Sequence, residues 1–526
     1  MNVWLVSREY AGIAEAGGVK NVARSLSESL ARKGHSVTLF IPLYACTDID
    51  TVQHFECIWH EPVFVNCAGK NVTVTFCHGS LNGVSIVFVS QRQFAEKKAV
   101  YVYTQEEEKL NPQNRHGTGH RDALELNVIF QKAVVEYGDT CAAEEAPDII
   151  HCQDATSALV PVFLNFKKQL SPLSREFYQK TKCVVTIHNA GPGYHHNFDS
   201  LQTASNLTAL PVSLLEKGLV GQSVEPFLLA SDCAILTTVS PQYAEEILSS
   251  KTETAGLGEA LSKKGSKIRG ITNGIDFDNY DPRDTSKSHL PFAFFPERKE
   301  LEGKYKCRSF LLENYGREDS VLMPGVQKFG CLELSQGEDQ PVFIVYHGRL
   351  VRQKGISVLI EVSRHLLQNN FPVRIVCVGQ GEGELEDSLA TLSREFRGRF
   401  LYFKGYDRSL ARLCTASADF SLFPSFFEPC GLEDFISQIY GTIPVANATG
   451  GLCKILDEET GFLFSPCTPQ KLIEILEPLI RIKTAAPDIF LPMIAFAAQH
   501  TRTVYNWDRV ASSYEKIYEE AMTLSC

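Results

Sequence analysis

The chain has 526 residues, too many for one ordinary hydrophobic core, so its length predicts two or more domains. Hydrophobic residues make up 44% of it and charged residues 21%, a balance typical of globular proteins. Its 51 basic residues against 62 acidic ones give a formal net charge of -11, which repels a phosphate backbone and argues against a nucleic-acid partner. A local basic pocket for one phosphorylated ligand is still compatible with this charge.

The sixteen cysteines are scattered singly, and no Cys-x-x-Cys pair provides the ligand spacing of a zinc site. We interpret cysteines on apolar stretches, such as Cys183 and Cys377, as small buried hydrophobic residues. The opening MNVWLVS has no basic segment followed by a long apolar run, and no stretch reaches the ~18 apolar residues of a membrane span. We therefore expect a cytoplasmic protein with no metal and no membrane partner.

Strand and helix patterns alternate from the first residues onward. Residues 3–6 predict a buried strand, a loop then reaches Gly17 and Gly18, apolar residues at helical spacing occupy 19–30, and residues 36–41 predict the next strand. Strand, glycine loop, helix and strand form a βαβ unit, which builds parallel sheets. Further strands are predicted in this half at residues 84–89, 149–152, 183–187 and 234–239, and an exposed loop at 105–120.

The pattern restarts after a less regular stretch at residues 282–340, which has one helical patch at 305–314 and otherwise resembles a linker. Strands are predicted beyond it at 342–346, 373–378, 401–403, 420–423 and 442–445, with a helix at 358–367. We therefore predict an α/β protein with two Rossmann-like parallel-sheet domains, at residues 1–275 and 276–505, and a C-terminal helix at 506–526. Ligands of such sheets bind at the carboxyl ends of the strands, so a central cleft that both domains face is the expected site.

Two loops that follow predicted strands are candidates for a phosphate site. Gly17 and Gly18 precede a helix, where glycine would let the backbone amides approach an anion, although a tight strand-to-helix turn explains them equally well. In GRLVRQKG, which starts at residue 348, Arg349 and Lys354 lie on one short loop. Two fixed cations at a strand end can hold a pyrophosphate and stabilise the charge that grows as it leaves; the alternative is a solvated basic turn.

The motif PSFFEPCGL at residues 424–432 also follows an apolar strand and leads into a helix. Glu428 lies in the intervening loop, beside the backbone amides of residues 430–432. A carboxylate next to exposed amides suits a sugar hydroxyl close to a phosphate, whereas a helix cap is the structural alternative. A second Gly-Gly turn, TGGL, starts at Thr449.

Taken in order, these segments resemble the bacterial glycogen and starch synthases, retaining glycosyltransferases with the GT-B fold of two Rossmann-like domains. The resemblance covers nearly the whole chain. It is carried by AGGVKNVARSL, HCQDATSALVPVFL, VVTIHN, LTTVSPQYAEEI, GITNGIDFDNYDP, GRLVRQKG, KGYDRSLARLC, PSFFEPCGL, GTIPVANATGGL and NWDRVASSYEKIY. It implies a C-terminal helix that crosses back to the first domain. It also implies transfer of glucose from ADP-glucose to the non-reducing end of an α-1,4-glucan (glycogen), with retention and without a cofactor.

The resemblance also implies which residues form the site. Catalysis would depend on Arg349 and Lys354, which bind the diphosphate, on Glu428, which holds the donor glucose, and on His188, whose carbonyl could lie near the anomeric carbon. A structural histidine is the alternative for His188. Asp154, His188 and Asn189 would line the sugar and acceptor side. The donor-binding set would be Gly17, Gly18, Arg349, Lys354, Tyr406 (facing the adenine), Glu428, Cys430, Gly431, Leu432, Thr449 and Gly450.

Several positions depart from the family's pattern, most importantly Glu15, which stands where the family has a lysine before the first Gly-Gly. A carboxylate there would repel a phosphate, so Glu15 must point away, pair with a cation such as Lys20, or leave the donor poorly bound. Two alternatives therefore stay open: a synthase that uses UDP-glucose, and a glucan-binding or regulatory homologue with weak or lost catalysis. The other replaced positions are Phe426 (Arg in the family), Ala155-Thr156 (Trp-His) and Asn447-Ala448 (a basic pair).

Overall fold

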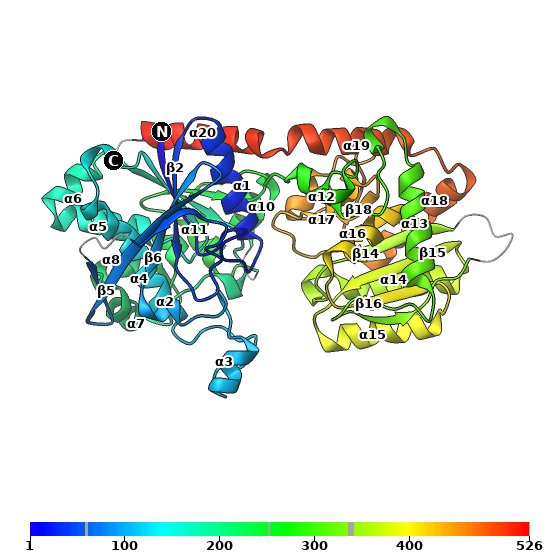
Figure 1. The fold of residues 1–526 in the computed structure, drawn as a ribbon, viewed down its shortest axis with the longest axis horizontal. Coiled ribbons are helices and arrows are strands. Elements are labelled where there is room, and N and C mark those ends of the chain that lie inside the picture. The colour runs from blue at the N-terminus through cyan, green and yellow to red at the C-terminus, as the bar shows by residue number, and fades with distance from the viewer. Residues whose placement is uncertain (58–61, 251–252, 335–340, 525–526) are drawn as a thin grey trace. The chain divides into compact units, whose positions relative to one another are not determined.

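The structure, a computed structural model, describes residues 1–57, 62–250, 253–334 and 341–524. Its internal contacts divide the chain into two units. Unit 1 comprises Met1–Asn273 and Trp507–Cys526, and unit 2 comprises Gly274–Asn506. Each unit has a mainly parallel sheet packed against helices (Figure 1), which confirms the predicted α/β class with two parallel sheets.

The sheet of unit 1 has the strand order β12-β11-β8-β7-β1-β2-β6-β5-β3, with β4 paired to β5. The strands from β12 to β6 run parallel, and β5 joins β6 antiparallel. Its central strands β1 and β7 are mostly apolar and, apart from the first residue of β1, fully buried, as expected for strands covered on both faces. The bounds are β1 Asn2–Val6, β2 Ser36–Pro42, β3 Gln53–Glu56, β4 Val63–Cys67, β5 Lys70–Leu81, β6 Val84–Ser90, β7 Ile149–Gln153, β8 Lys182–Ile187, β11 Ile235–Thr238 and β12 Ile268–Gly270.

The first and last long helices of unit 1 pack against each other, although they come from opposite ends of the chain (Figure 1). Helix α1 (Val19–Arg32) buries the apolar side that its spacing predicts, and α20 (Trp507–Thr523) lies along it. Ion pairs join them between Arg32 and Asp508 (2.9 Å) and between Lys33 and Glu515 (3.1 Å). The other helices of eight or more residues in this unit are α4 Ala123–Tyr137, α5 Val160–Leu170, α7 Leu201–Thr208 and α10 Pro241–Ser249.

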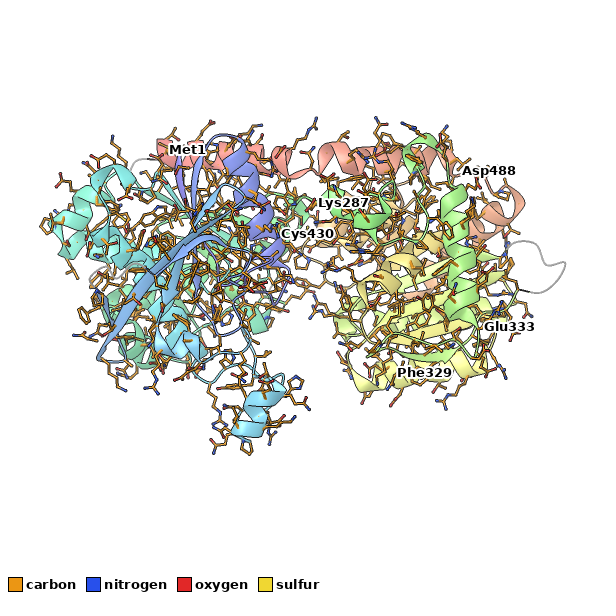
Figure 2. All side chains as sticks on the ribbon, in the orientation of Figure 1. Met1, Lys287, Phe329, Glu333, Cys430 and Asp488 are labelled. Atoms are coloured by element: carbon orange, nitrogen blue, oxygen red, sulfur yellow. A yellow bond between two sulfur atoms is a disulfide. The ribbon has the colours of Figure 1, made fainter. Side chains whose placement is uncertain are left out.

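The sheet of unit 2 has the order β13-β16-β15-β14-β17-β18-β19, parallel except for the edge strand β13. Phe329 of β13, labelled in Figure 2, stacks on the buried Tyr402 of β16 with ring centroids 5.6 Å apart. The strands are β13 Gln327–Gly330, β14 Val342–His347, β15 Val373–Gly379, β16 Phe400–Lys404, β17 Phe420–Phe423, β18 Ile443–Asn447 and β19 Phe462–Phe464. The described helices are α12 Thr285–Ser288, α13 Glu302–Leu311, α14 Ile356–Gln368, α15 Gly383–Glu395, α16 Arg408–Ser417, α17 Glu433–Ile439, α18 Pro469–Ala485 and α19 Leu491–Val504.

Three features differ from the sequence-based expectations. The predicted loop at 105–120 contains a short helix, α3 (Gln105–Leu110). A capping box between Thr104 and Glu107 caps its N-terminus. The stretch interpreted as a linker with one helix contains that helix, α13, but also contributes the edge strand β13. Cys57 and Cys77 form a disulfide, which their separate positions in the sequence did not indicate. Among the described helices, none is long and apolar enough to cross a membrane.

Candidate functional site

A cavity of about 350 Å³ lies in unit 2, where the carboxyl ends of its parallel strands meet. The segment after β14 contributes Arg349 and Lys354, and the segment after β17 contributes Glu428. Gln380 follows β15 and Tyr406 follows β16. Each of these side chains is thus positioned by the end of a buried strand, which is why short apolar runs followed by polar motifs could indicate the site from sequence.

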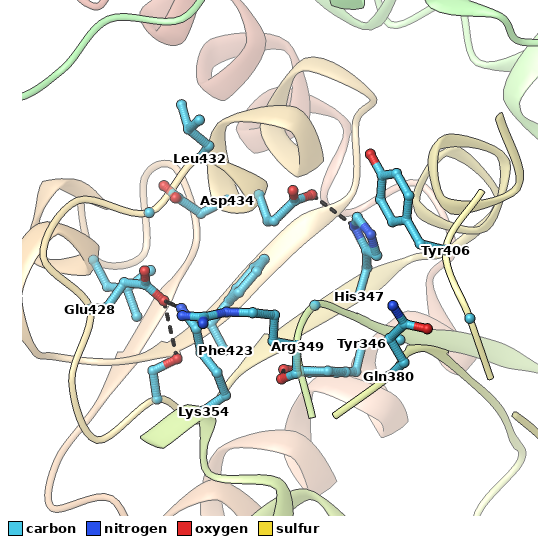
Figure 3. A pocket seen from close by; sticks show the side chains of 17 residues that line it. Tyr346, His347, Arg349, Lys354, Gln380, Tyr406, Phe423, Glu428, Leu432 and Asp434 are labelled. Atoms are coloured by element: carbon cyan, nitrogen blue, oxygen red, sulfur yellow. Dashed lines mark hydrogen bonds and ion pairs between the residues drawn. The ribbon is translucent and has the colours of Figure 1, made fainter. Parts of the chain in front are cut away.

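The cavity holds two cations whose surroundings differ (Figure 3). The ammonium group of Lys354 forms a close ion pair with Glu428, whose Oε2 also accepts a hydrogen bond of 3.3 Å from Ser425 Oγ. The guanidinium of Arg349 forms no ion pair with any residue that the structure describes, while its backbone carbonyl accepts a hydrogen bond from Tyr346. An unneutralised guanidinium facing a cavity is suited to an anionic ligand.

The two loops that carry the motifs EPCGL and TGG pack tightly on each other beside the cavity. The Gly451 amide donates to the Glu428 carbonyl at 2.8 Å, and a Cβ at Gly451 would lie only 2.0 Å from the Cys430 carbonyl oxygen. Lys454 donates to the carbonyls of Cys430 (2.6 Å) and Gly451 (3.0 Å) and pairs with Asp434 at 2.8 Å. The glycine is therefore required by close approach of the loops, and Lys454 ties them together.

A second ion pair lies on the cavity wall. His347 Nδ1 and Glu433 Oε2 are 2.9 Å apart, and the His347 ring lies nearly parallel to that of Tyr406, at 20° and 6.4 Å between centroids (Figure 3). Burial favours the neutral imidazole, but the neighbouring Glu433 outweighs it and raises the pKa of His347. Sequence reasoning missed this pair, because nothing in the sequence indicates that residues 86 positions apart meet.

The predicted sugar-side residues lie together in unit 1, at the ends of β7 and β8. Asp154 adopts a left-handed backbone with φ of 65°, and its Oδ1 accepts a hydrogen bond from the His188 amide at 3.3 Å. Burial raises the pKa of Asp154 to about 7 and lowers the pKa of His188 to about 4. His188 Nε2 lies 2.8 Å from Gln153 Oε1, and the Asn189 side chain accepts from the Gly191 amide. His188 is thus neutral and fixed near neutral pH.

The structure resolves the question that Glu15 raised, because this residue pairs with a cation. Its two carboxylate oxygens accept hydrogen bonds from Lys20 Nζ (2.6 Å) and the Gly12 amide (2.7 Å). The amides of Ala16 and Gly17 donate to the buried Glu9, a residue that sequence reasoning missed. In this loop, therefore, the Gly17 amide, a candidate for an anion, is already bound to a carboxylate of the chain itself.

The structure brings part of the predicted donor set to one cavity. Cys430, Thr449 and Gly450 lie in the loops beside the cavity, and Gly17 and Gly18 belong to unit 1. Within the described part of the chain, no cluster of three or more His, Cys, Asp or Glu residues is arranged to hold a metal ion. The predicted residues that line the cavity are Arg349, Lys354, Tyr406, Glu428, Gly431 and Leu432.

Comparison with known proteins gives the class and then the family. Residues 335–487 match the family "Glycosyl transferases group 1", and residues 2–271 match the family "Starch synthase catalytic domain". The glycogen synthase of Myxococcus xanthus is 30% identical over 99% of both chains, and that of Aeromonas hydrophila is 28% identical over 99% of this chain and 98% of the relative. The chain therefore belongs to the glycogen and starch synthase family of glycosyltransferases.

A solved structure agrees with this assignment at the level of the fold. The catalytic domain of starch synthase IV from Arabidopsis thaliana, bound to ADP and acarbose, superposes with a TM-score of 0.78. It covers 99% of both chains at 24% sequence identity, so it supports the fold rather than individual residues.

Proposed function

We propose that this chain transfers glucose from ADP-glucose to the non-reducing end of an α-1,4-glucan, with retention of configuration. The observation that carries the proposal is the cavity of unit 2, where Arg349, which has no ion-pair partner among the described residues, lies beside Lys354, Glu428 and the exposed ring of Tyr406. These groups match the parts of a nucleotide sugar: a diphosphate, a hexose with hydroxyl groups, and a base. Membership of the synthase family and the ADP in the starch synthase IV structure support this choice of donor.

Arg349 and Lys354 have the main electrostatic role in this reaction. As the bond between the glucose C1 and the diphosphate breaks, negative charge grows on the departing phosphate oxygen, and two fixed cations stabilise it. Glu428 orients the glucose through its hydroxyls, while the glucan hydroxyl attacks C1 from the face that the diphosphate leaves and passes its proton to the departing phosphate oxygen. We assign Asp154, His188 and Asn189 to the sugar side, as the family resemblance implies.

A glucan-binding homologue with weak catalysis is the second candidate, and the Gly17-Gly18 loop favours it. Glu15 replaces a cation, and Glu9 already engages the Ala16 and Gly17 amides. Both features make this loop less attractive to phosphate than a lysine with open amides would be. A synthase that uses UDP-glucose is the remaining alternative.

Incubation of purified protein with glycogen and radiolabelled ADP-glucose or UDP-glucose tests these candidates. We expect label from ADP-glucose in the precipitated polymer, and a loss of about a hundredfold or more in kcat/KM in Arg349→Ala and in Lys354→Ala. Arg352→Ala is the matched control, because Arg352 lies on the same loop but is 81% exposed and outside the cavity.

Each other outcome selects a different conclusion. Unchanged turnover in both Arg349→Ala and Lys354→Ala would refute the proposed role of the cavity. Incorporation from UDP-glucose alone would change the donor. Glycogen co-sedimentation without incorporation from either donor would favour the binding homologue.

A further inference from the structure

Glu433 is a carboxylate of the cavity that the proposed reaction does not use. It is the first residue of α17 and lines the cavity with its side chain 38% exposed. His347 holds its Oε2, whereas its Oε1 accepts no hydrogen bond from any residue that the structure describes. A purely structural ion pair does not require this exposure, so one carboxylate oxygen is available to a ligand.

The groups along the cavity follow the order of the parts of a nucleoside diphosphate. In Figure 3, Arg349, Lys354 and Glu428 lie together at one end, while His347 and Tyr406 lie at the other. A nucleotide with its phosphates at the cations and its base at the Tyr406 ring has its ribose between these ends.

Glu433 lies between the phosphate end and the base end of the cavity. It is bonded to His347 at the base end and lies close enough to Lys354 at the phosphate end to be stabilised by its charge. A carboxylate accepts hydrogen bonds from the vicinal hydroxyls of a ribose, the same chemistry that acidic residues provide in dinucleotide-binding folds.

We propose that Glu433 recognises the ribose hydroxyls of the nucleoside diphosphate donor, and that His347 is a positioning residue that orients the Glu433 carboxylate. This inference rests on the proposed function, since it concerns the donor of that reaction. It assigns to the chain a means of selecting ribonucleotides over deoxyribonucleotides.

The charge of Glu433 is compatible with a neighbouring diphosphate. Burial opposes its ionisation, but His347 and Lys354 outweigh that effect and lower the pKa of Glu433, so the group is a carboxylate and a pure acceptor at neutral pH. The positive charges of His347 and Lys354 also reduce the repulsion between Glu433 and the diphosphate.

Calorimetric titration of the full chain with ADP, 2′-deoxy-ADP and 3′-deoxy-ADP tests the inference. We expect at least one deoxy nucleotide to bind about tenfold or more weakly than ADP, the loss typical of a hydrogen bond to a charged group. In Glu433→Ala the ratio of the dissociation constants should fall to about one. The ratio is the decisive quantity, because repulsion between Glu433 and the diphosphate affects all three nucleotides equally and cancels.

The role of His347 is tested through the same ratio. His347→Phe keeps a ring against Tyr406 but loses the Nδ1 donor, and should lower the ratio. His347→Asn should restore it, because the asparagine amide can donate from the place of Nδ1. Glu384→Ala is the control, since Glu384 is an exposed carboxylate of α15 outside the cavity, and should leave the ratio unchanged.

The inference on Glu433 would be overturned if the ratio of dissociation constants were unaltered in Glu433→Ala, or were near one in the wild type. The positioning role of His347 would be overturned if the ratio in His347→Asn were no higher than in His347→Phe. Glucose transfer from labelled ADP-glucose, measured in parallel, distinguishes failure of the ribose assignment from failure of the proposed function. Transfer with an unaltered ratio overturns the ribose assignment alone, whereas absence of both transfer and ADP binding overturns both.

Discussion

Removing the charge of Lys454 should destabilise unit 2, because this side chain joins the two loops beside the cavity. Its side chain is 4% exposed, and the ammonium group donates to carbonyls of both loops as well as to Asp434, whose side chain is fully buried. Lys454→Met keeps the aliphatic stem and removes the donor. The change leaves the Asp434 carboxylate and the loop carbonyls without their shared partner.

The magnitude follows from the burial of the pair. Removing one partner of a buried ion pair costs about 3–5 kcal/mol, because the remaining charge is left uncompensated. Burial already raises the pKa of Asp434 from its usual 3.8, and Lys454 opposes that rise, so without Lys454 the pKa rises further. Each further unit adds about 1.4 kcal/mol at a pH above it. The folded variant then keeps a proton that the unfolded chain releases, so its deficit grows as the pH rises.

Urea unfolding at pH 5 and pH 8, followed by hydrogen exchange of peptides from unit 2, measures this deficit. Tryptophan emission is unsuitable, because none of the three tryptophans of the sequence lies within residues 274–506, which form unit 2. The control is Lys471→Met, which breaks a half-exposed pair with Glu474 at 2.8 Å and should cost less than about 1 kcal/mol. A loss in Lys454→Met no larger than in this control, or one that does not grow with pH, would refute the reasoning.

Three further outcomes concern unit 1 and the base end of the cavity. Asp154→Asn should flatten the pH dependence of the melting temperature, since burial raises the pKa of Asp154 from 3.8 to about 7 and the wild type loses stability as the pH rises between these values; identical pH profiles would contradict this. Gly17→Ala should lower the melting temperature and Gly18→Ala should not, because a Cβ at Gly17 lies 3.1 Å from Glu9 Oε1 and one at Gly18 meets nothing within 4 Å. Tyr406→Ala should leave stability intact, as Tyr406 is 62% exposed, and raise KM for ADP-glucose about tenfold, whereas Tyr406→Phe should not.

Most strands of the two sheets could be predicted because their residues are largely apolar, and the structure shifts most of their ends by only one or two residues. The strands β3, β4, β5, β12, β13 and β19 were not predicted. Strand β1 was predicted at residues 3–6 and occupies Asn2–Val6, and β17 was predicted at residues 420–423, which it occupies. Loop motifs at strand ends were predictable for the same reason, since a parallel sheet gathers its carboxyl ends at one edge. Arg349 and Lys354 share the loop after β14 and Glu428 comes from the loop after β17, yet the order of the strands alone brings them to the same cavity.

Features that depend on pairing between distant segments could not be predicted. The Cys57–Cys77 disulfide and the His347–Glu433 pair each join residues that no local pattern connects. The helix α3 was missed because its polar composition resembles a loop, and what begins it is the capping box at Thr104 rather than an apolar face. In each case the feature depends on an interaction that the periodicity of hydrophobic residues does not reveal.

The carboxylates of the cavity are neutralised within the cavity wall, which supports the anion site that we propose there despite the replaced cations. Among the described residues, the three acidic side chains that line the cavity each have a basic partner: Glu428 pairs with Lys354, Glu433 with His347 and Asp434 with Lys454. Arg349 has no such partner in the described chain, so its charge is the one that an incoming diphosphate meets first. A diphosphate that also displaces Glu428 from Lys354 gains a second cation and frees the carboxylate for the hydroxyls of the glucose. On this argument donor binding rearranges one ion pair, and the other two hold the loops and the ribose contact in place.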